Sequence, residues 1–83
     1  MSATETRLSL HRSLYLLDAV RAAADTYGPY AESIAIDEQP EAFVVTLRGY
    51  DAGYGEDFGD NFANHALFET VVRTRQTLAG VAL

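Results

Sequence analysis

The sequence has no cysteine, no lysine and only two prolines among its 83 residues. The missing cysteine excludes disulfides, thiolate zinc sites, iron–sulfur ligation and cysteine nucleophiles. No apolar run approaches the roughly 18 residues that a membrane span needs. Residues 1–7 have no apolar core of the kind that a signal peptide carries. We therefore expect a cytoplasmic protein that does not associate with a membrane.

What remains is the composition of a globular chain, with 48% hydrophobic and 22% charged residues. These proportions exclude a disordered or fibrous protein. Eighty-three residues have room for one small core of two layers. We expect a single domain that spans residues 1–83.

Charge of one sign dominates: twelve acids face six arginines, for a formal net charge of −6. A protein that reads the nucleic-acid backbone needs the opposite sign, so we expect no nucleic-acid partner. The imbalance is concentrated in residues 32–60, where eight acids face Arg48 alone. It indicates either a solubilising surface or an acidic face that steers a basic partner.

Three segments have the alternating pattern of half-buried strands: residues 5–11, 31–38 and 41–49. Gln39-Pro40 between the last two has turn chemistry and predicts an antiparallel hairpin. The side chains expected to face inward are Leu8, Leu10, Ile34, Ile36, Phe43, Val45 and Leu47.

A first helix is predicted over residues 15–27. Ser13 precedes it as a candidate N-cap, Gly28 is a natural C′ residue, and Pro29 prevents continuation. The apolar stripe of this helix is Leu17, Val20, Ala24 and Tyr27.

A loop over residues 49–57 leads to a second helix that Asp57 or Asp60 caps. Gly80 is expected to mark its end. The apolar stripe predicted for this helix is Phe58, Phe62, Ala66, Leu67, Val71 and Leu78.

The order β-α-β-β-α predicts an α+β fold, a two-layer sandwich with a three-stranded mixed sheet of order 1-3-2 and both helices on one face. A right-handed crossover makes the first two strands parallel, and the third fits antiparallel between them. Val44, Thr46 and Arg48 would then lie on the uncovered face, between two open sheet edges. An open face and open edges on so small a domain suggest a partner.

Residues that could carry chemistry are few. His11 and His65 have no ligand spacing between them, and the acidic stretch from Asp51 to Asp60 has Gly53 and Gly55 where a calcium loop needs Asp or Asn. The serines have no recognisable base nearby. We therefore expect no catalytic residues, no metal and no cofactor, and the protein is predicted not to be an enzyme.

Tyr50 and Tyr54 flank glycines in the acidic loop. Aromatic side chains on a loop anchor a peptide or protein partner, unless they fold back over the core. Asp51, Glu56 and Asp57 in the same loop would favour a basic patch on that partner.

The layout resembles the HxsD-like family of the His-Xaa-Ser peptide-maturation system, over about residues 8–75. The resemblance is carried by the order and spacing of four short motifs. Residues 68–73 are less polar than the Gln-rich stretch usual in the family and their arginine is displaced by one position, which marks a diverged member. The four motifs are Leu14-Tyr15, Ala22-Ala23-Ala24, Phe43-Val44-Val45-Thr46-Leu47 and Phe62-Ala63-Asn64.

The resemblance implies a small non-catalytic accessory protein of a system in which radical SAM enzymes modify ribosomal peptides. The partner would be the precursor peptide, the modifying enzyme, or both. Binding would use strand addition at residues 31–38 or packing around Val44, Thr46 and Arg48. The alternatives are a homodimer formed through the open sheet, with no peptide role, and a small enzyme or metal protein that uses His11 or His65.

Overall fold

The computed structural model describes residues 5–54 and 57–81, and within it the three strands and two helices predicted from the sequence are present. Two short 3-10 helices, η1 and η2, supplement them. In chain order the elements are β1 (Glu5–His11), α1 (Leu17–Tyr27), η1 (Gly28–Tyr30), β2 (Ser33–Glu38), β3 (Ala42–Arg48), η2 (Ala52–Tyr54) and α2 (Asp57–Val81).

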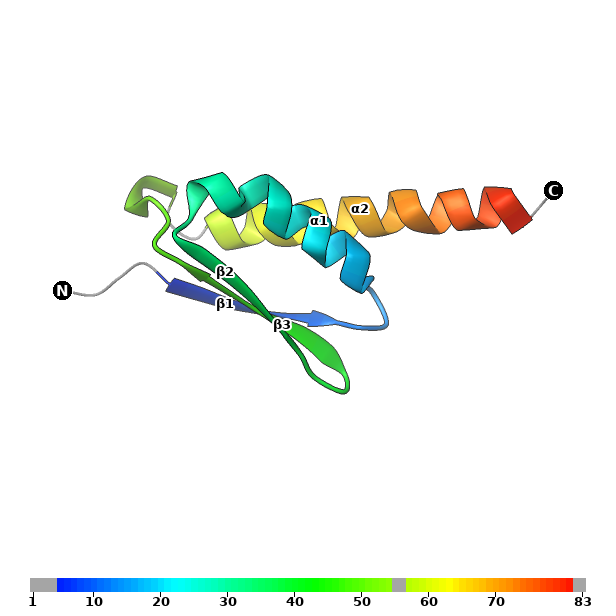
Figure 1. Cartoon of the computed structure of the whole chain (residues 1–83), viewed down its shortest axis with the longest axis horizontal. Helices are drawn as coiled ribbons and strands as arrows, with labels where there is room; N and C mark the ends of the chain where they lie inside the picture. Colours follow the sequence, from blue (N-terminus) through cyan, green and yellow to red (C-terminus); the bar gives the residue numbers. More distant parts are fainter. Residues whose placement is uncertain (1–4, 55–56, 82–83) are drawn as a thin grey trace.

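The three strands form one sheet of order β1-β3-β2, as predicted. The prediction of a mixed sheet is wrong, because β3 pairs antiparallel with both of its neighbours. The crossover through α1 does bring β2 back parallel to β1, but one strand position is left between them. The hairpin return fills that position, so the two parallel strands never pair and every ladder is antiparallel (Figure 1).

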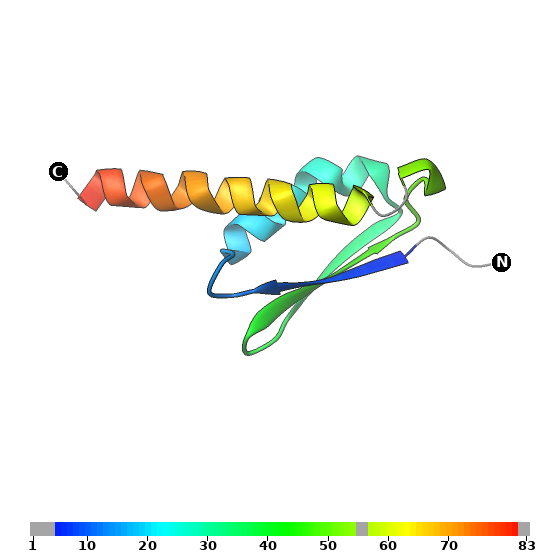
Figure 2. The same ribbon diagram turned by 180° about the vertical axis from the view of Figure 1, so that it is seen from behind.

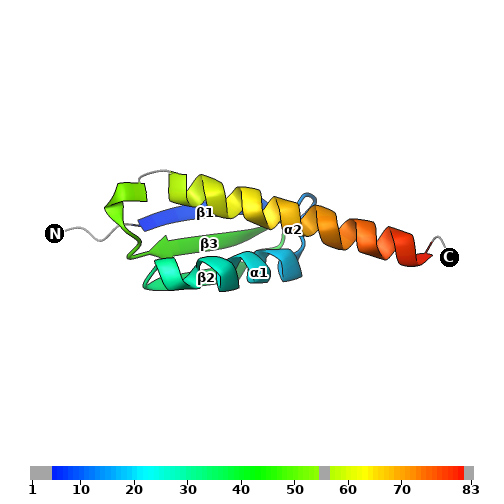
Figure 3. The ribbon, with the colours of Figure 1, turned by 90° about the horizontal axis from the view of Figure 1, so that it is seen from above.

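Both helices lie on the same side of this sheet (Figures 1 and 2). Seen from above, α1 runs over β2, and α2 runs beside α1 (Figure 3). The alternation in β3 follows from this cover: Phe43, Val45 and Leu47 face the helices and are at most 3% exposed. Their neighbours along the strand, Val44 and Thr46, face the other way and are only half-buried.

Helix α1 begins at Leu17, two residues later than predicted. Ser13 does not cap it, because the Ser13 hydroxyl hydrogen-bonds to His11 Nδ1 at 2.9 Å within the preceding turn. The N-cap is Leu16, whose side chain cannot cap. Its backbone N–H donates instead to Thr70 Oγ1 of α2, at 3.1 Å, so that the start of one helix is held by a side chain of the other.

The end of α1 also differs from the expected glycine cap. Gly28 has φ −51° and stays in the right-handed helical region. Pro29 has no N–H and stops the α-helix, but its fixed φ suits the first turn of a helix. The chain therefore tightens into η1 instead of turning away, and Tyr30 is carried to the end of the helical layer.

Helix α2 buries Phe58, Phe62 and Ala66, as predicted. The rest of the predicted stripe is wrong at Leu67 and Val71, which are 41% and 40% exposed. Thr70, four residues after Ala66, takes the next buried position. Steps of four residues follow the line along which α2 meets α1, whereas the predicted stripe shifted by one residue at Leu67.

The C-terminal part of α2 extends past the sheet, and the helix ends at Val81, one residue beyond Gly80 (Figure 1). The side chain of Leu78 lies outside the described residues.

Candidate functional site

The face of the sheet away from the helices carries the predicted docking residues. Each of them lies in the central strand β3, with one residue of each edge strand beside it. This face has an acidic row, a basic row and an ion-paired row. The rows are Ser9–Val44–Asp37, Arg7–Thr46–Ala35 and Glu5–Arg48–Ser33.

A shallow hollow of ≈ 470 Å³ lies at the hairpin end of this face. Val44 and Ala42 of β3 supply apolar floor, and Ser9 of β1 borders it. The hairpin closes it with Gln39, Pro40 and Glu41. Apolar contacts with a polar border are the usual composition of a small docking surface.

Arg48 is already paired on this face. Its Nε lies 2.8 Å from Glu5 Oε1, and both side chains are about half exposed. An ion pair as exposed as this contributes little to stability, on the order of 0–1 kcal/mol. The ion pair does compensate the charge of Arg48. Of the three predicted docking residues in β3, Val44 therefore offers an apolar contact, whereas Arg48 offers a charge that Glu5 already neutralises.

Both edges of the sheet are open. β1 and β2 each pair only with β3 within the described part of the chain. A strand at an edge keeps half of its backbone groups unpaired, which makes it a template for a further strand. The strand predicted to accept a peptide, β2, lies directly beside Val44 through the Asp37 pairing.

Tyr50 is not available as a partner anchor, which corrects the prediction made from the loop sequence. It is 5% exposed and stacks on Phe58, with ring centroids 4.6 Å apart and planes 13° apart. The Tyr50 hydroxyl shares a hydrogen bond with the hydroxyl of Thr6 in β1. Tyr50 therefore folds back over the core, the alternative that the sequence left open.

The other predicted loop residues that the structure describes, Asp51, Tyr54 and Asp57, are exposed. Asp51 shapes the loop: its carboxylate accepts the Gly53 N–H at 2.8 Å, and its carbonyl accepts the Tyr54 N–H at 3.0 Å. Tyr54 is 43% exposed, and Asp57 is exposed in the first turn of α2. Glu56 lies outside the described residues.

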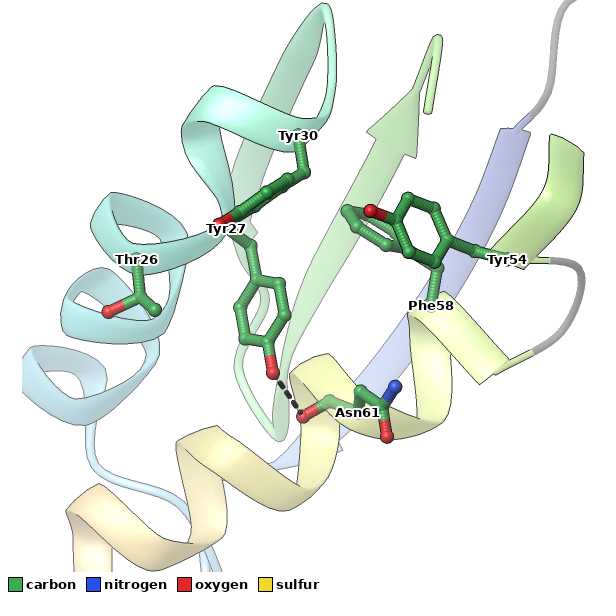
Figure 4. Close-up of a pocket in the computed structure, with 6 residues that line it drawn as sticks. All are labelled: Thr26, Tyr27, Tyr30, Tyr54, Phe58 and Asn61. Carbon is green, nitrogen blue, oxygen red and sulfur yellow. Dashed lines mark hydrogen bonds between the residues drawn. The ribbon is translucent and has the colours of Figure 1, made fainter. Parts of the chain in front are cut away.

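Tyr54 belongs to a second hollow, of ≈ 360 Å³, in the helical layer (Figure 4). Tyr27 and Tyr30 stand on the α1 side of it, and Tyr54 and Phe58 on the α2 side. Thr26 and Asn61 complete the lining. Tyr27 belongs to a predicted helix and Tyr54 to a predicted loop, and no pattern in the sequence predicts that the two meet.

The two histidines lie in different elements and have different partners. His11 Nδ1 bonds to Ser13, while His65 Nε2 lies 3.4 Å from a carboxylate oxygen of Glu69 one helical turn away. Within residues 5–54 and 57–81 no three His, Asp or Glu side chains gather where a metal ion could be held.

No helix in the described part of the chain is both long and apolar enough to cross a membrane. A scan against protein-family models, a search of curated proteins and a search of solved structures each gave no match for this chain.

Proposed function

We propose that this chain is a non-catalytic binding protein whose partner docks on the open face of the sheet. The observation that supports it is the layer arrangement: both helices cover one face, and the other has the apolar hollow at Val44. In the peptide-maturation system that the sequence resembles, the partner is the precursor peptide or the radical SAM enzyme that modifies it.

The face and its edge support one mode of binding. An extended peptide added along β2 gains backbone hydrogen bonds from the edge strand. Side chains of such a peptide alternate between the two faces, and those on the open side point the same way as Asp37 and Val44. Because β2 lies between the added strand and Val44, an apolar side chain of the peptide enters the hollow only by reaching across Asp37. The edge supplies affinity that does not depend on sequence.

The acidic surface steers a basic partner toward this chain. Asp51 and Asp57 are exposed, and no arginine forms an ion pair with either of them in the described residues. Exposed charges of this kind act mainly on the association rate. Replacing both with Asn should slow association at low salt, and an unchanged rate would mean that the acids serve only solubility.

The test is a pull-down with the tagged chain from its native organism, with the bound proteins and peptides identified by mass spectrometry. We expect a radical SAM enzyme or a small ribosomal peptide among them. Binding of that partner is then measured for Val44→Asp, Val44→Arg and Val44→Thr. The first two place a charge of either sign on the apolar floor and should abolish binding, while Val44→Thr keeps the shape and should retain most of it.

Circular dichroism and thermal melting show whether each variant still folds. If the partner still binds either charged variant, it does not dock on the open face. Recovery of only further copies of this chain, together with a concentration-dependent dimer in sedimentation, would favour the homodimer instead. A dimer through this face should itself dissociate in both charged variants.

A further inference from the structure

We propose that the hollow between the ends of α1 and α2 is a receptor for an arginine side chain of a partner peptide. It is formed by α1, η1, η2 and α2, without the open sheet face, so the inference does not depend on the function proposed above. The aromatic residues at its centre are Tyr27, Tyr30, Tyr54 and Phe58, which we call the aromatic pocket.

The rings leave an opening because they meet in two pairs. Tyr30 contacts Tyr27 at a centroid distance of 6.5 Å, and Tyr54 contacts Phe58 at 5.5 Å. Tyr27 and Phe58 join the pairs at the bottom, edge to face at 5.7 Å. The outer rings, Tyr30 and Tyr54, are 55% and 43% exposed. They stand as two walls above a floor of aromatic rings (Figure 4).

The polar groups of the pocket can accept hydrogen bonds from a ligand that donates them. The Tyr27 hydroxyl donates to the backbone carbonyl of Asn61 at 3.4 Å, so its oxygen can still accept. The Tyr30 and Tyr54 hydroxyls and the Asn61 side-chain amide have no hydrogen-bond partner in the described residues. Oxygen acceptors around aromatic faces match a guanidinium, which stacks through its plane and donates from its edge.

Charge around the pocket selects a cation over a neutral ring. Asp25, Asp57 and Asp60 are exposed, and each is the chain neighbour of a lining residue. No ion pair compensates any of the three in the described residues. The residues between Arg21 and Arg48 and those between Arg48 and Arg73 include no arginine or lysine. The two walls of the pocket come from these two stretches, which have acids and no strong base.

The pocket also has the size that this occupant needs. Its ≈ 360 Å³ lies at the lower end of the volumes typical of small-ligand sites. It is open on one side, where the backbone of a bound peptide would remain in solvent. It has room for one long side chain inserted from that side.

The probe is the tripeptide acetyl-Gly-Arg-Gly-amide, titrated into the isotope-labelled full chain and followed by NMR. We expect saturable shifts at the backbone amides of the lining residues and none at Ser9 or Val44 of the open face. The lining residues are Thr26, Tyr27, Tyr30, Tyr54, Phe58 and Asn61. The citrulline tripeptide has the same shape without the charge, and should bind about 2- to 30-fold more weakly, the range of a cation–π contribution.

Variants distinguish the contribution of the Tyr54 ring to binding from that of its hydroxyl and from non-specific effects of a substitution. Tyr54→Leu should reduce binding by a similar factor, whereas Tyr54→Phe keeps the aromatic face and most of the affinity. Phe68→Leu is the matched control, because Phe68 is an exposed ring on α2 outside the pocket. Asp57→Asn should weaken binding at low salt and make it less sensitive to salt.

The inference is overturned if the citrulline peptide binds as well as the arginine peptide, or if no saturable shift occurs up to about 10 mM. It is also overturned if the shifts fall on the open face, or if Phe68→Leu weakens binding as much as Tyr54→Leu does. Unchanged core chemical shifts in each variant establish that the fold is intact. A failure of this experiment leaves the pull-down test of the open face unaffected.

Discussion

The contact between Thr70 and the start of α1 gives a stability prediction with a defined size. Thr70 is 9% exposed, and its Oγ1 accepts the Leu16 N–H at 3.1 Å while donating to the Ala66 carbonyl at 2.9 Å. Leu16 is the N-cap of α1 and has no side-chain cap of its own. The first N–H groups of a helix have no partner within it, so Thr70 supplies a cap from a different helix.

Replacing Thr70 with Val keeps the branched shape and removes the acceptor. A backbone N–H left without a partner costs about 1–3 kcal/mol when buried. Here the site is only partly buried, and the new methyl adds apolar contact. We therefore expect a net loss of about 1 kcal/mol, which corresponds to a melting temperature lower by about 4–8 °C for a domain of this length.

Urea denaturation and hydrogen exchange measure this loss separately. Thr70→Ser keeps the hydroxyl and removes one methyl, so it should lose stability while preserving the slow exchange of the Leu16 amide. Thr70→Val should lose that protection. If the Leu16 amide exchanges equally slowly in the Val variant and the native chain, the cap is not what holds α1 against α2, and the reasoning fails.

Four further substitutions test the backbone at Gly49 and the packing of the core. Gly49→Ala should cost about 1–3 kcal/mol in urea denaturation, because Gly49 has φ +71° and a Cβ there would lie 2.5 Å from Glu32 Cγ; native stability would contradict this backbone geometry. Phe62→Ala should cost about 3–5 kcal/mol and Phe68→Ala less than about 0.5, since the first ring is 0% and the second 61% exposed; equal losses in thermal melts would contradict the assigned face of α2. Tyr50→Phe should lose about 1 kcal/mol of unfolding free energy with its hydroxyl hydrogen bond, and no loss would mean that the bond contributes nothing.

The strands were predictable because their signal is local. Residues 5–11 alternate over the whole of β1, and the observed strand, Glu5–His11, has the same bounds. The hairpin followed from two alternating runs and a turn at Pro40. A crossover rule then left one arrangement of three strands, so the order could be predicted without knowledge of any long-range contact.

The wrong predictions concern positions at which a residue far away in the sequence determines the local structure. Ser13 has the composition of an N-cap, but His11 takes its hydroxyl, and the cap comes from Thr70, 54 residues along the chain from Leu16. In α2, periodicity gave the stripe as far as Ala66 and then failed at Leu67. The line along which two helices cross determines which residues continue the buried face, and that line cannot be predicted from either helix alone.

The same limit applies to the two candidate sites. The open face could be predicted, because it follows from strand order and side-chain alternation. The aromatic pocket could not, because Tyr27 and Tyr30 meet Tyr54 and Phe58 only through the packing of α1 against α2. A signal did exist in the absence of arginine from the segments that form its walls, but an absence of positive charge does not indicate which segments meet.

The two proposed sites lie in different layers of the domain. The hollow at Val44 is lined by β1, β3 and the turn between β2 and β3, whereas the aromatic pocket is lined by the helical layer and its flanking turns. The sheet separates them, so a partner at one site leaves the other open (Figure 1). One partner segment could then occupy the open face of the sheet while another occupies the aromatic pocket. If both proposals hold, two such contacts would raise the effective concentration of the bound partners for one another.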